Sequence, residues 1–252
     1  SLLPQASVTV IQANTIERLP SVGEPDLLRS LQLLPGVQSA SDISSGLYVR
    51  GGGPDQTRIL LDQVPLYNPA HAFGFFSTFN PDAIKDVTFY KGAYPAQYGG
   101  NLGAVLDVQN KEGNRKEFSG KGAISLISGR LMLEGPIKEG SWTIAGRRTY
   151  LDPVLNIVRN RGNEVPDYYF YDLNGKVNRQ KGDRDTFVIS SYFGRDYLDF
   201  QLDPKADSFF NIVWGNKALM GRWKRIFTPT VFGRFVTFFS QYQSDINVRI
   251  FD

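Results

Sequence analysis

The sequence has 252 residues, 41% hydrophobic and 13% aromatic, so it can bury a sizeable core and is not a disordered tail. Its 28 basic and 25 acidic residues give a formal net charge of +3, too nearly balanced to indicate a nucleic-acid-binding protein. The absence of cysteine excludes disulfides and thiol nucleophiles, and the single histidine, His71, leaves little room for histidine-based catalysis. No apolar run predicts a transmembrane helix, and the first residues do not read as a signal peptide, so we expect a mature or trimmed amino terminus.

Residues 1–112 mix short apolar runs with helix signals and with frequent glycine and proline. Alternating or β-branched runs predict strands, which lie at residues 7–12, 47–50, 57–62, 86–92 and 103–111. Leucines at helical spacing predict a helix in residues 21–36, with Pro25 at its first position and Pro35 after its end. A second, shorter helix is expected to begin at Asn80, an ordinary N-cap residue followed by proline. These features indicate a compact α+β domain.

Residues 113–252 lack most helix signals, and their apolar residues repeat with a period of two. In residues 167–180 one face is aromatic and apolar (Tyr169, Tyr171, Leu173, Val177), and the other is polar (Asp172, Asn174, Lys176, Asn178). About six strands are predicted, several of them longer than usual in soluble sheets. They lie near residues 120–134, 141–151, 167–180, 186–197, 209–227 and 231–245.

Long amphipathic strands joined by short turns are typical of an antiparallel membrane β-barrel, whose strands need roughly 9 to 11 residues and turn their apolar positions to lipid. The alternative is a soluble β-sandwich with one buried face. Strand length, aromatic residues near strand ends and the polar opposite face favour the barrel. Arg130, Arg148 and Arg234 interrupt the alternation.

Three consecutive glycines, Gly51 to Gly53, follow a short strand segment. A Walker-type phosphate loop would need a later glycine, lysine and serine or threonine at fixed spacing, and a dinucleotide loop would need a helix directly after its glycines. Residues 54–62 instead continue towards a strand. We therefore expect a tight turn or a close approach of the backbone in a confined space.

Four segments occur in order along the chain: LLRSLQLLPGVQS, YVRGGGPDQTRILLDQVPLYN, FGFFSTFNPDAIKDVTFYKGAYPAQYGGNLGAVLDV and GRRTYLD. Together they resemble a TonB-dependent outer-membrane receptor, most closely of the Bacteroidetes type. The resemblance implies a plug domain in residues 1–112 and the first strands of the barrel in residues 113–252. Because the family's barrel has roughly 22 strands around the plug, about six strands cannot close it, and we expect part of a longer protein. The family's energy-coupling box is not found in this sequence.

The resemblance also implies roles for individual residues. Arg50 is expected to lock the plug to the barrel wall, because an arginine inside a filled barrel seeks carboxylates, and Asp62 is the second residue of this plug–barrel latch. One loop would contact the substrate or pack against further barrel strands; it contains Tyr67, Asn68, His71, Phe73, Phe75 and Phe76. A second loop, with Tyr94, Gln97 and Tyr98, has the same two interpretations.

Arg147 and Arg148 lie on opposite faces of one predicted strand. This spacing predicts one arginine in the lumen and the other near the lipid headgroups, although both could be solvated turn residues.

The sequence has no carboxylate pair at a defined spacing, no nucleophile with a base and no calcium loop, so we expect no enzyme, metal site or cofactor. The leading hypothesis is active import of an iron chelate, corrinoid, glycan or peptide across the bacterial outer membrane. Its expected partners are a periplasmic TonB-type energy-transducing protein, outer-membrane lipid and a surface lipoprotein, but not nucleic acid. The alternatives are a non-transporting plugged-barrel subunit of an envelope or secretion complex and a soluble β-rich binding protein.

Overall fold

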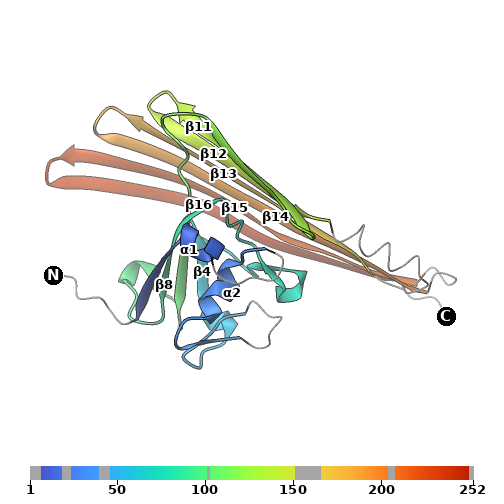
Figure 1. The fold of residues 1–252 in the computed structure, drawn as a ribbon. Coiled ribbons are helices and arrows are strands. Elements are labelled where there is room, and N and C mark those ends of the chain that lie inside the picture. Colours follow the sequence, from blue (N-terminus) through green and yellow to red (C-terminus); the bar gives the residue numbers. More distant parts are fainter. Residues whose placement is uncertain are drawn as a thin grey trace.

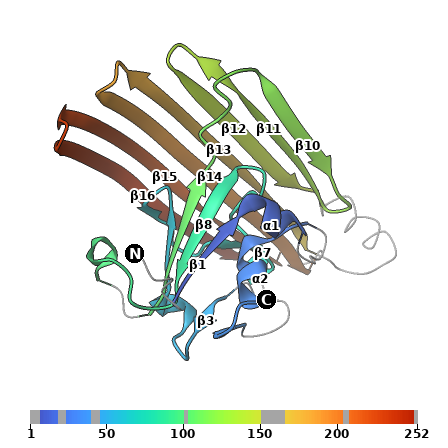
Figure 2. The same cartoon turned by 60° about the vertical axis from the view of Figure 1, so that its left-hand side comes forward.

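The computed structural model describes residues 7–18, 24–39, 46–100, 103–150, 166–203 and 208–249. The described residues up to Glu112 form a compact α+β body, the inner region, and strands β10 to β16 form one long antiparallel sheet that curves over it (Figure 1). Figure 2 shows the strands of the inner region running towards the concave face of the long sheet. None of the described helices has the length and hydropathy of a membrane-spanning helix.

The inner region is built on a five-stranded sheet in the order β1-β8-β9-β4-β5. Its strands are β1 (Val8–Gln12), β4 (Arg58–Leu61), β5 (Val64–Pro65), β8 (Ile84–Tyr90) and β9 (Val105–Asn110). Strands β4 and β9 run parallel, and the other neighbours are antiparallel. Val87, Phe89 and Leu106 are fully buried in the core between this sheet and the helices. The strands predicted at residues 7–12, 57–62, 86–92 and 103–111 are therefore confirmed.

Two helices cover this core, α1 (Ala13–Arg18) and α2 (Leu27–Gln32). The α2 helix buries Leu27, Leu28 and Leu31, as its leucine spacing predicts, but it begins later than expected. Asp26 is its N-cap and accepts a hydrogen bond from the Arg29 backbone N–H at 3.0 Å. The predicted first helical residue, Pro25, therefore lies outside the helix, because an aspartate satisfies the free N–H groups of the first turn better than proline does.

The helix predicted to begin at Asn80 is wrong. The Asn80 side chain accepts a hydrogen bond from the Asp82 backbone N–H at 3.0 Å, and the Asn80 carbonyl accepts one from Ala83 at 3.0 Å. These bonds close a turn, and strand β8 starts at Ile84. The capping capacity of asparagine serves a turn here because the residues that follow alternate with the period of a strand.

Short elements complete the inner region. Two small antiparallel pairs join β2 (Val37–Gln38) to β3 (Tyr48–Val49) and β6 (Ala70–His71) to β7 (Phe76–Ser77). Single 3₁₀ turns lie at η1 (Pro54–Gln56), η2 (Ala72–Gly74) and η3 (Ala96–Tyr98).

The triple glycine forms the predicted tight turn. Val49 and Gly52 exchange backbone hydrogen bonds of 3.0 and 2.9 Å, and Gly51 has φ +85°, a conformation that side chains disfavour. After this turn and η1 the chain enters strand β4, so the glycines do not open a phosphate-binding helix.

The long sheet contains seven strands in sequence order, one more than predicted. They are β10 (Ser119–Ile124), β11 (Ser128–Ile137), β12 (Gly140–Thr149), β13 (Asp167–Lys181), β14 (Asp185–Asp203), β15 (Ser208–Thr228) and β16 (Val231–Arg249). The extra strand arises because residues 120–134, predicted as one strand, fold as a hairpin. The Ser125 hydroxyl accepts hydrogen bonds from the backbone N–H groups of Ile127 and Ser128 at 3.3 and 3.0 Å, and these bonds close the turn between β10 and β11.

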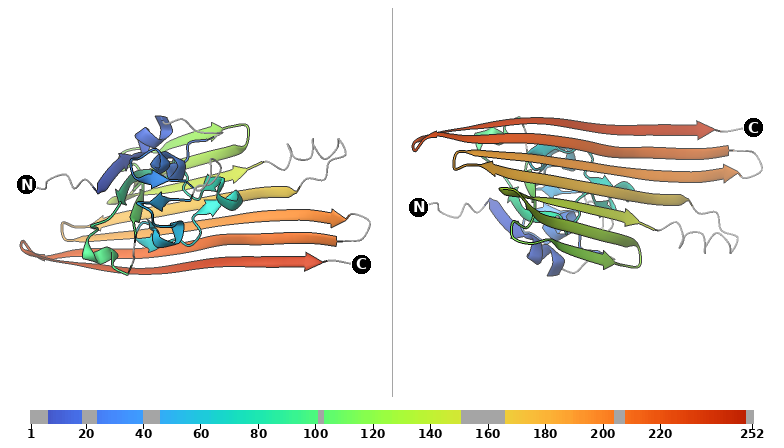
Figure 3. Two further views of the ribbon diagram at one scale, coloured as in Figure 1. Left: turned by 90° about the horizontal axis from the view of Figure 1, so that it is seen from below. Right: turned by 90° about the horizontal axis from the view of Figure 1, so that it is seen from above.

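The polarity of the long sheet is the reverse of that in a soluble sandwich. On β13 the polar residues Asp172, Asn174 and Lys176 are buried against the inner region, whereas Leu173 is 47% exposed. On β15 Leu219 is likewise 50% exposed. In Figure 3 the inner region lies in front of the sheet in the view from below and behind it in the view from above. This combination of a polar covered face and an apolar bare face is typical of the wall of an outer-membrane barrel.

The lipid-facing position of this bare face can be tested by placing a charge on it. We expect Ile189→Arg, between Phe187 and Phe193 on the bare face of β14, to lower the free energy of unfolding of the full-length protein in lipid vesicles by about 2–4 kcal/mol, because an arginine near the middle of a bilayer is poorly solvated. Gln241→Arg, nearer the end of the apolar band, should cost at most about 1 kcal/mol. Chemical unfolding of both variants in vesicles measures the difference. An equal cost for the two variants would contradict the lipid-facing assignment.

Candidate functional site

A buried ionic contact joins the inner region to the long sheet. The sheet supplies Arg147 from β12, Asp172 from β13 and Asp196 from β14, and the inner region supplies Glu24 and His71. Every one of these residues is at most 3% exposed. The register pairs Arg147 directly with Asp172, so the period of two that builds the sheet also places both charges on its covered face.

Arg147 lies at the centre of the contact. Its guanidinium donates to Asp172 Oδ2 from Nε at 2.7 Å and from Nη2 at 2.5 Å. It also donates to Glu24 Oε1 at 2.6 Å and to the Ser77 carbonyl at 2.7 Å, both in the inner region. The second Glu24 oxygen accepts from the Ser128 hydroxyl of β11 at 2.6 Å. One arginine of the sheet thus binds a side chain and a backbone carbonyl of the inner region.

His71 makes the complementary link in the opposite direction. Its Nε2 lies 2.8 Å from Asp172 Oδ1, and its Nδ1 lies 2.5 Å from Asp196 Oδ2. A neutral imidazole has one N–H, so donation to both carboxylates requires the imidazolium form. Burial alone would lower the pKa of His71, but Asp172 and Asp196 outweigh burial and raise the pKa to about 9. The ring stacks on Phe170, with centroids 4.0 Å apart.

Hydroxyl and backbone donors complete the contact. Tyr192 donates to Asp172 Oδ1 at 2.6 Å, Tyr168 donates to Asp196 Oδ1, and the Ala72 backbone N–H donates to the same Asp196 oxygen at 3.2 Å. Gly194 makes room for this arrangement, because a Cβ there would lie 2.1 Å from the Tyr192 hydroxyl oxygen. Three carboxylates therefore face two cations and further donors, as buried charges require.

Asp62, which the resemblance assigns to a plug–barrel latch, lies in a second ionic contact with the long sheet. Asp62 accepts from Lys176 Nζ of β13 at 2.7 Å and from the Ser190 hydroxyl of β14 at 2.5 Å. The same Lys176 donates to the Asn110 carbonyl at 2.9 Å, and the Asn110 backbone N–H donates to Asp62 at 3.2 Å. The lysine is thereby held by two segments of the inner region.

A third ionic contact lies on β10 and β11. Asp82, 1% exposed in the inner region, is 2.9 Å from Lys121 Nζ and 3.4 Å from Arg130 Nε. Arg130, which interrupts the predicted alternation, therefore faces a carboxylate. In each of the three contacts a carboxylate of the inner region meets a cation of the sheet.

Arg50 does not make the contact expected of it. It is exposed, it occupies the β3 turn with φ +49°, and its side chain lies beside Gly36 and Gly92 of the inner region. Within the described part of the chain no ion pair joins Arg50 to the long sheet. The turn holds the guanidinium among inner-region glycines, and Arg147 supplies the arginine link instead.

The predicted aromatic loop divides into two groups. Tyr67, Asn68 and Phe73 line a cavity of about 560 Å³ in the inner region, and Phe73 is 70% exposed. His71 and Phe76 are buried, and both rings lie beside Phe170 of the sheet, which agrees with packing against the barrel strands, the second of the two interpretations. The surrounding loop is strained, because Asn68, Ala72 and Phe73 all have positive φ.

Residues of this aromatic loop also contact the rest of the inner region and the long sheet. Phe75 lies under the Arg29 guanidinium at 4.7 Å. The Asn68 amide donates to the Tyr242 hydroxyl of β16 at 3.3 Å, and the ring centroids of Phe73 and Trp214 of β15 are 4.9 Å apart. This loop therefore contacts the wall and the cavity at once.

The second predicted loop has a mainly structural residue. Tyr98 is buried and donates to Asp107 at 2.8 Å, and both burial and this carboxylate raise the pKa of Tyr98. Tyr94 is half-buried against the same small cluster, and Gln97 is exposed. Only Gln97 of the three is free of core packing.

Sequence reasoning missed the partners that complete the main contact. Glu24 follows no recognisable motif, and the alternation assigns Asp172 to a polar strand face without indicating its partner. A usable signal existed, because charged residues at every second position of a strand inside a plugged barrel must meet the plug. The identity of each partner depends on segments far apart in sequence.

Neighbouring arginines give a direct test of the main contact. Residues 1–252 contain no cysteine, so Ala83→Cys would place the single thiol of this part of the protein in a cluster buried with Met132 and Ala145 of the sheet. In that background we expect Arg147→Ala to increase maleimide labelling at least about tenfold, since loss of one partner of a buried ion pair costs about 3–5 kcal/mol. Arg148→Ala, on the outward face of the same strand, should leave labelling unchanged. Equal labelling of the two variants would contradict the role of Arg147.

The charge of His71 predicts a pH dependence. Its folded pKa of about 9 exceeds its ordinary 6.5, so its stabilisation is complete below pH 6.5 and is lost as the pH rises through 9. Between those limits we expect the wild type to lose roughly 3 kcal/mol more unfolding free energy than His71→Gln. Chemical unfolding across this pH range provides the measurement. Parallel curves for the two proteins would show that His71 is neutral.

The family described as TonB-dependent Receptor Plug Domain matches residues 4–105. No curated protein matches the sequence. The Bacteroidetes-type subclass stays a prediction.

Solved structures with the same fold cover nearly the whole chain. The siderophore receptor PirA from Pseudomonas aeruginosa is 20% identical with a TM-score of 0.66. The alignment covers 97% of this chain and 42% of the PirA chain. The outer membrane transporter YddB from Escherichia coli is 13% identical with a TM-score of 0.68, and the alignment covers 93% of this chain and 38% of the YddB chain. A mutant of the ferric enterobactin receptor PfeA from P. aeruginosa, in complex with enterobactin, is 18% identical with a TM-score of 0.56. The alignment covers 98% of this chain and 47% of the PfeA chain.

The chain thus spans less than half the length of these structures, and it aligns with them through both its inner region and its long sheet. Residues 4–105 therefore match the TonB-dependent receptor plug domain family, and the chain shares its fold with these solved outer-membrane receptor and transporter structures through both its inner region and its long sheet.

Proposed function

We propose that the full-length protein is an active importer of the bacterial outer membrane. A small nutrient binds between the inner region and the extracellular loops, and a periplasmic TonB-type protein pulls on the inner region to open a path. The protein performs no covalent chemistry in this cycle. The plug family of residues 4–105 and the inverted polarity of the long sheet support the assignment.

The observation that carries this proposal is the polar attachment of the inner region to the wall. Three separate contacts, centred on Arg147, Lys176 and Asp82, consist of charged groups that water can solvate once they part. The main core contains a few sheet residues, Val188, Tyr192, Ala218 and Met220, and otherwise lies within the inner region. Such a body can be held firmly at rest and still be moved while most of its own core stays closed.

An iron chelate is the substrate class that we favour among those considered. The support comes from the similar structures, because PirA is named a siderophore receptor and PfeA a ferric enterobactin receptor. In this chain the cavity lined by Tyr67, Asn68 and Phe73 is the candidate contact surface, with two aromatic rings and an amide exposed together. The planar faces of these rings suit a flat catecholate or a similar ring-bearing chelator.

A reversible cross-link tests the transport mechanism. Ala83→Cys with Ala145→Cys places one thiol on each side of the interface between the inner region and the sheet. We expect uptake of an iron-labelled siderophore by cells to stop when the disulfide is oxidised and to return on reduction. Uptake should also require the TonB-type partner.

A matched disulfide within the sheet serves as the control. Ser191 and Leu219 are direct neighbours on β14 and β15, and their replacement by a cysteine pair should not affect uptake. Uptake through the oxidised interface cross-link would overturn the mechanism. Substrate-independent co-purification of stoichiometric envelope proteins, without uptake, would instead favour a non-transporting subunit.

A further inference from the structure

The bare face of the long sheet changes from apolar to cationic along a definite boundary. Outward residues of β14 run from Phe187 through Ile189 to Phe193 and then reach Arg195. On β15 the outward residues run from Trp223 to Leu219 and then reach Lys217. Both cations lie beyond the apolar stretch, on the side away from the short β13–β14 and β15–β16 turns.

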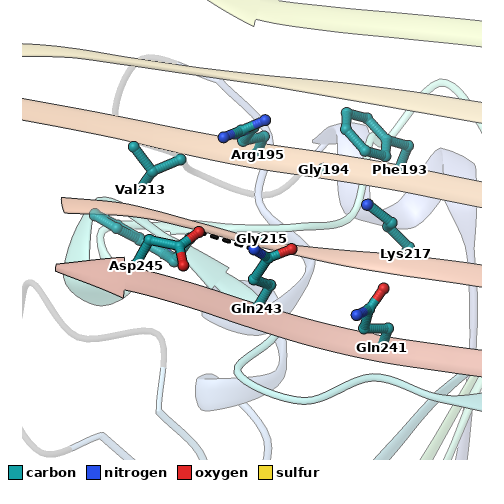
Figure 4. Close-up of a pocket in the computed structure, with 10 residues that line it drawn as sticks. Phe193, Gly194, Arg195, Val213, Gly215, Lys217, Gln241, Gln243 and Asp245 are labelled. Atoms are coloured by element: carbon teal, nitrogen blue, oxygen red, sulfur yellow. Dashed lines mark hydrogen bonds between the residues drawn. The ribbon is translucent and has the colours of Figure 1, made fainter.

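Arg195 and Lys217 border a small notch, shown in Figure 4. Its volume is about 40 Å³, and its walls come from β14, β15 and β16. The register places Gly215 beside Arg195 on one side and beside Gln243 on the other. A Cβ on Gly215 would lie 2.1 Å from the Gly194 carbonyl oxygen, so the floor of the notch must be backbone.

The notch has an excess of positive charge. Lys217 Nζ lies 5.9 Å from the Phe193 ring centroid, and across the described strands no carboxylate pairs with Lys217 or Arg195. The one carboxylate of the notch, Asp245, accepts a hydrogen bond from Gln243 at 2.9 Å. Arg148 on β12 is a third exposed cation at the same boundary, with its guanidinium 5.3 Å from the Tyr169 ring centroid.

Membrane energetics restrict where such cations can lie. A cation on the lipid face is strongly disfavoured at the bilayer midplane and is tolerated near an interface. Long stems let arginine and lysine rest on apolar surface while their charges reach the headgroups. Two cations around a recess then offer charge-assisted hydrogen bonds to a phosphate, which is the anion found at that depth.

We propose that Arg195 and Lys217 bind the phosphate of an anionic membrane lipid over Gly215, with Arg148 as a flanking cation. The acyl chains of this lipid lie along the apolar stretch from Phe193 towards Ile189. The site rests on one part of the proposed function, that the bare face meets lipid, and it is independent of which nutrient is imported.

Lipid binding by the full-length protein in detergent tests the site directly. Native mass spectrometry would be used to titrate phosphatidic acid, and diacylglycerol with the same acyl chains would replace it in a parallel arm. We expect Arg195→Gln/Lys217→Gln to weaken phosphatidic acid binding about tenfold or more, since each cation contributes about 1 kcal/mol towards an anionic lipid. Arg195→Lys/Lys217→Arg should keep the binding and would show that the notch still folds.

Arg179→Gln/Lys181→Gln is the matched control, because it also removes two exposed cations, from β13 at the short-turn end. Equal losses in the control and in the notch variant would overturn the proposal. Equal binding of diacylglycerol, or displacement of the lipid by equimolar inorganic phosphate, would also overturn it. Nutrient uptake is not the readout, so a failure here is distinguishable from a failure of the transport mechanism.

Discussion

A charge buried away from water has to be paired, and this constraint sets how the inner region sits against the long sheet. Arg147 cannot be buried unless Asp172 and Glu24 reach it, and Asp172 and Asp196 in turn require His71 between them. Because these partners come from β12, β13, β14 and two segments of the inner region, only one relative placement satisfies all of them. The ionic contact therefore specifies the docking geometry, whereas the apolar core specifies the inner region itself.

The same constraint explains why the long sheet has a polar covered face and an apolar bare face. A strand that faces a polar body on one side and lipid on the other must alternate in the opposite sense to a strand of a soluble sandwich. Lys176 and Leu173 show this on β13, since the lysine is buried against Asp62 and the leucine is bare. Separation exposes the charged groups, which water solvates well, together with smaller apolar contacts such as those of Ala83 with Met132 and Ala145.

Prediction from sequence succeeded where the signal was periodic and failed where a local motif had two uses. The alternation of β13 located its two faces correctly, and the leucine spacing located α2. Asn80 has the chemistry of a helix cap but closes a turn, and residues 120–134 have strand character throughout although Ser125 folds them back. His71 has the chemistry of a ligand-binding residue, but it is a buried cation between two carboxylates.

The sequence by itself determined the class of the protein: an α+β part followed by long two-faced strands, with no catalytic pattern and with an ordered set of plug-like segments. Alternation and spacing are local properties, so they can be read along the chain. Only the tertiary structure decided that Lys176 is the partner of Asp62, that Arg50 has no ion pair with the described strands of the long sheet, and that Arg147 joins Glu24 across 123 positions of sequence. Which charges meet is a matter of how distant segments pack, and burial then makes each pairing obligatory.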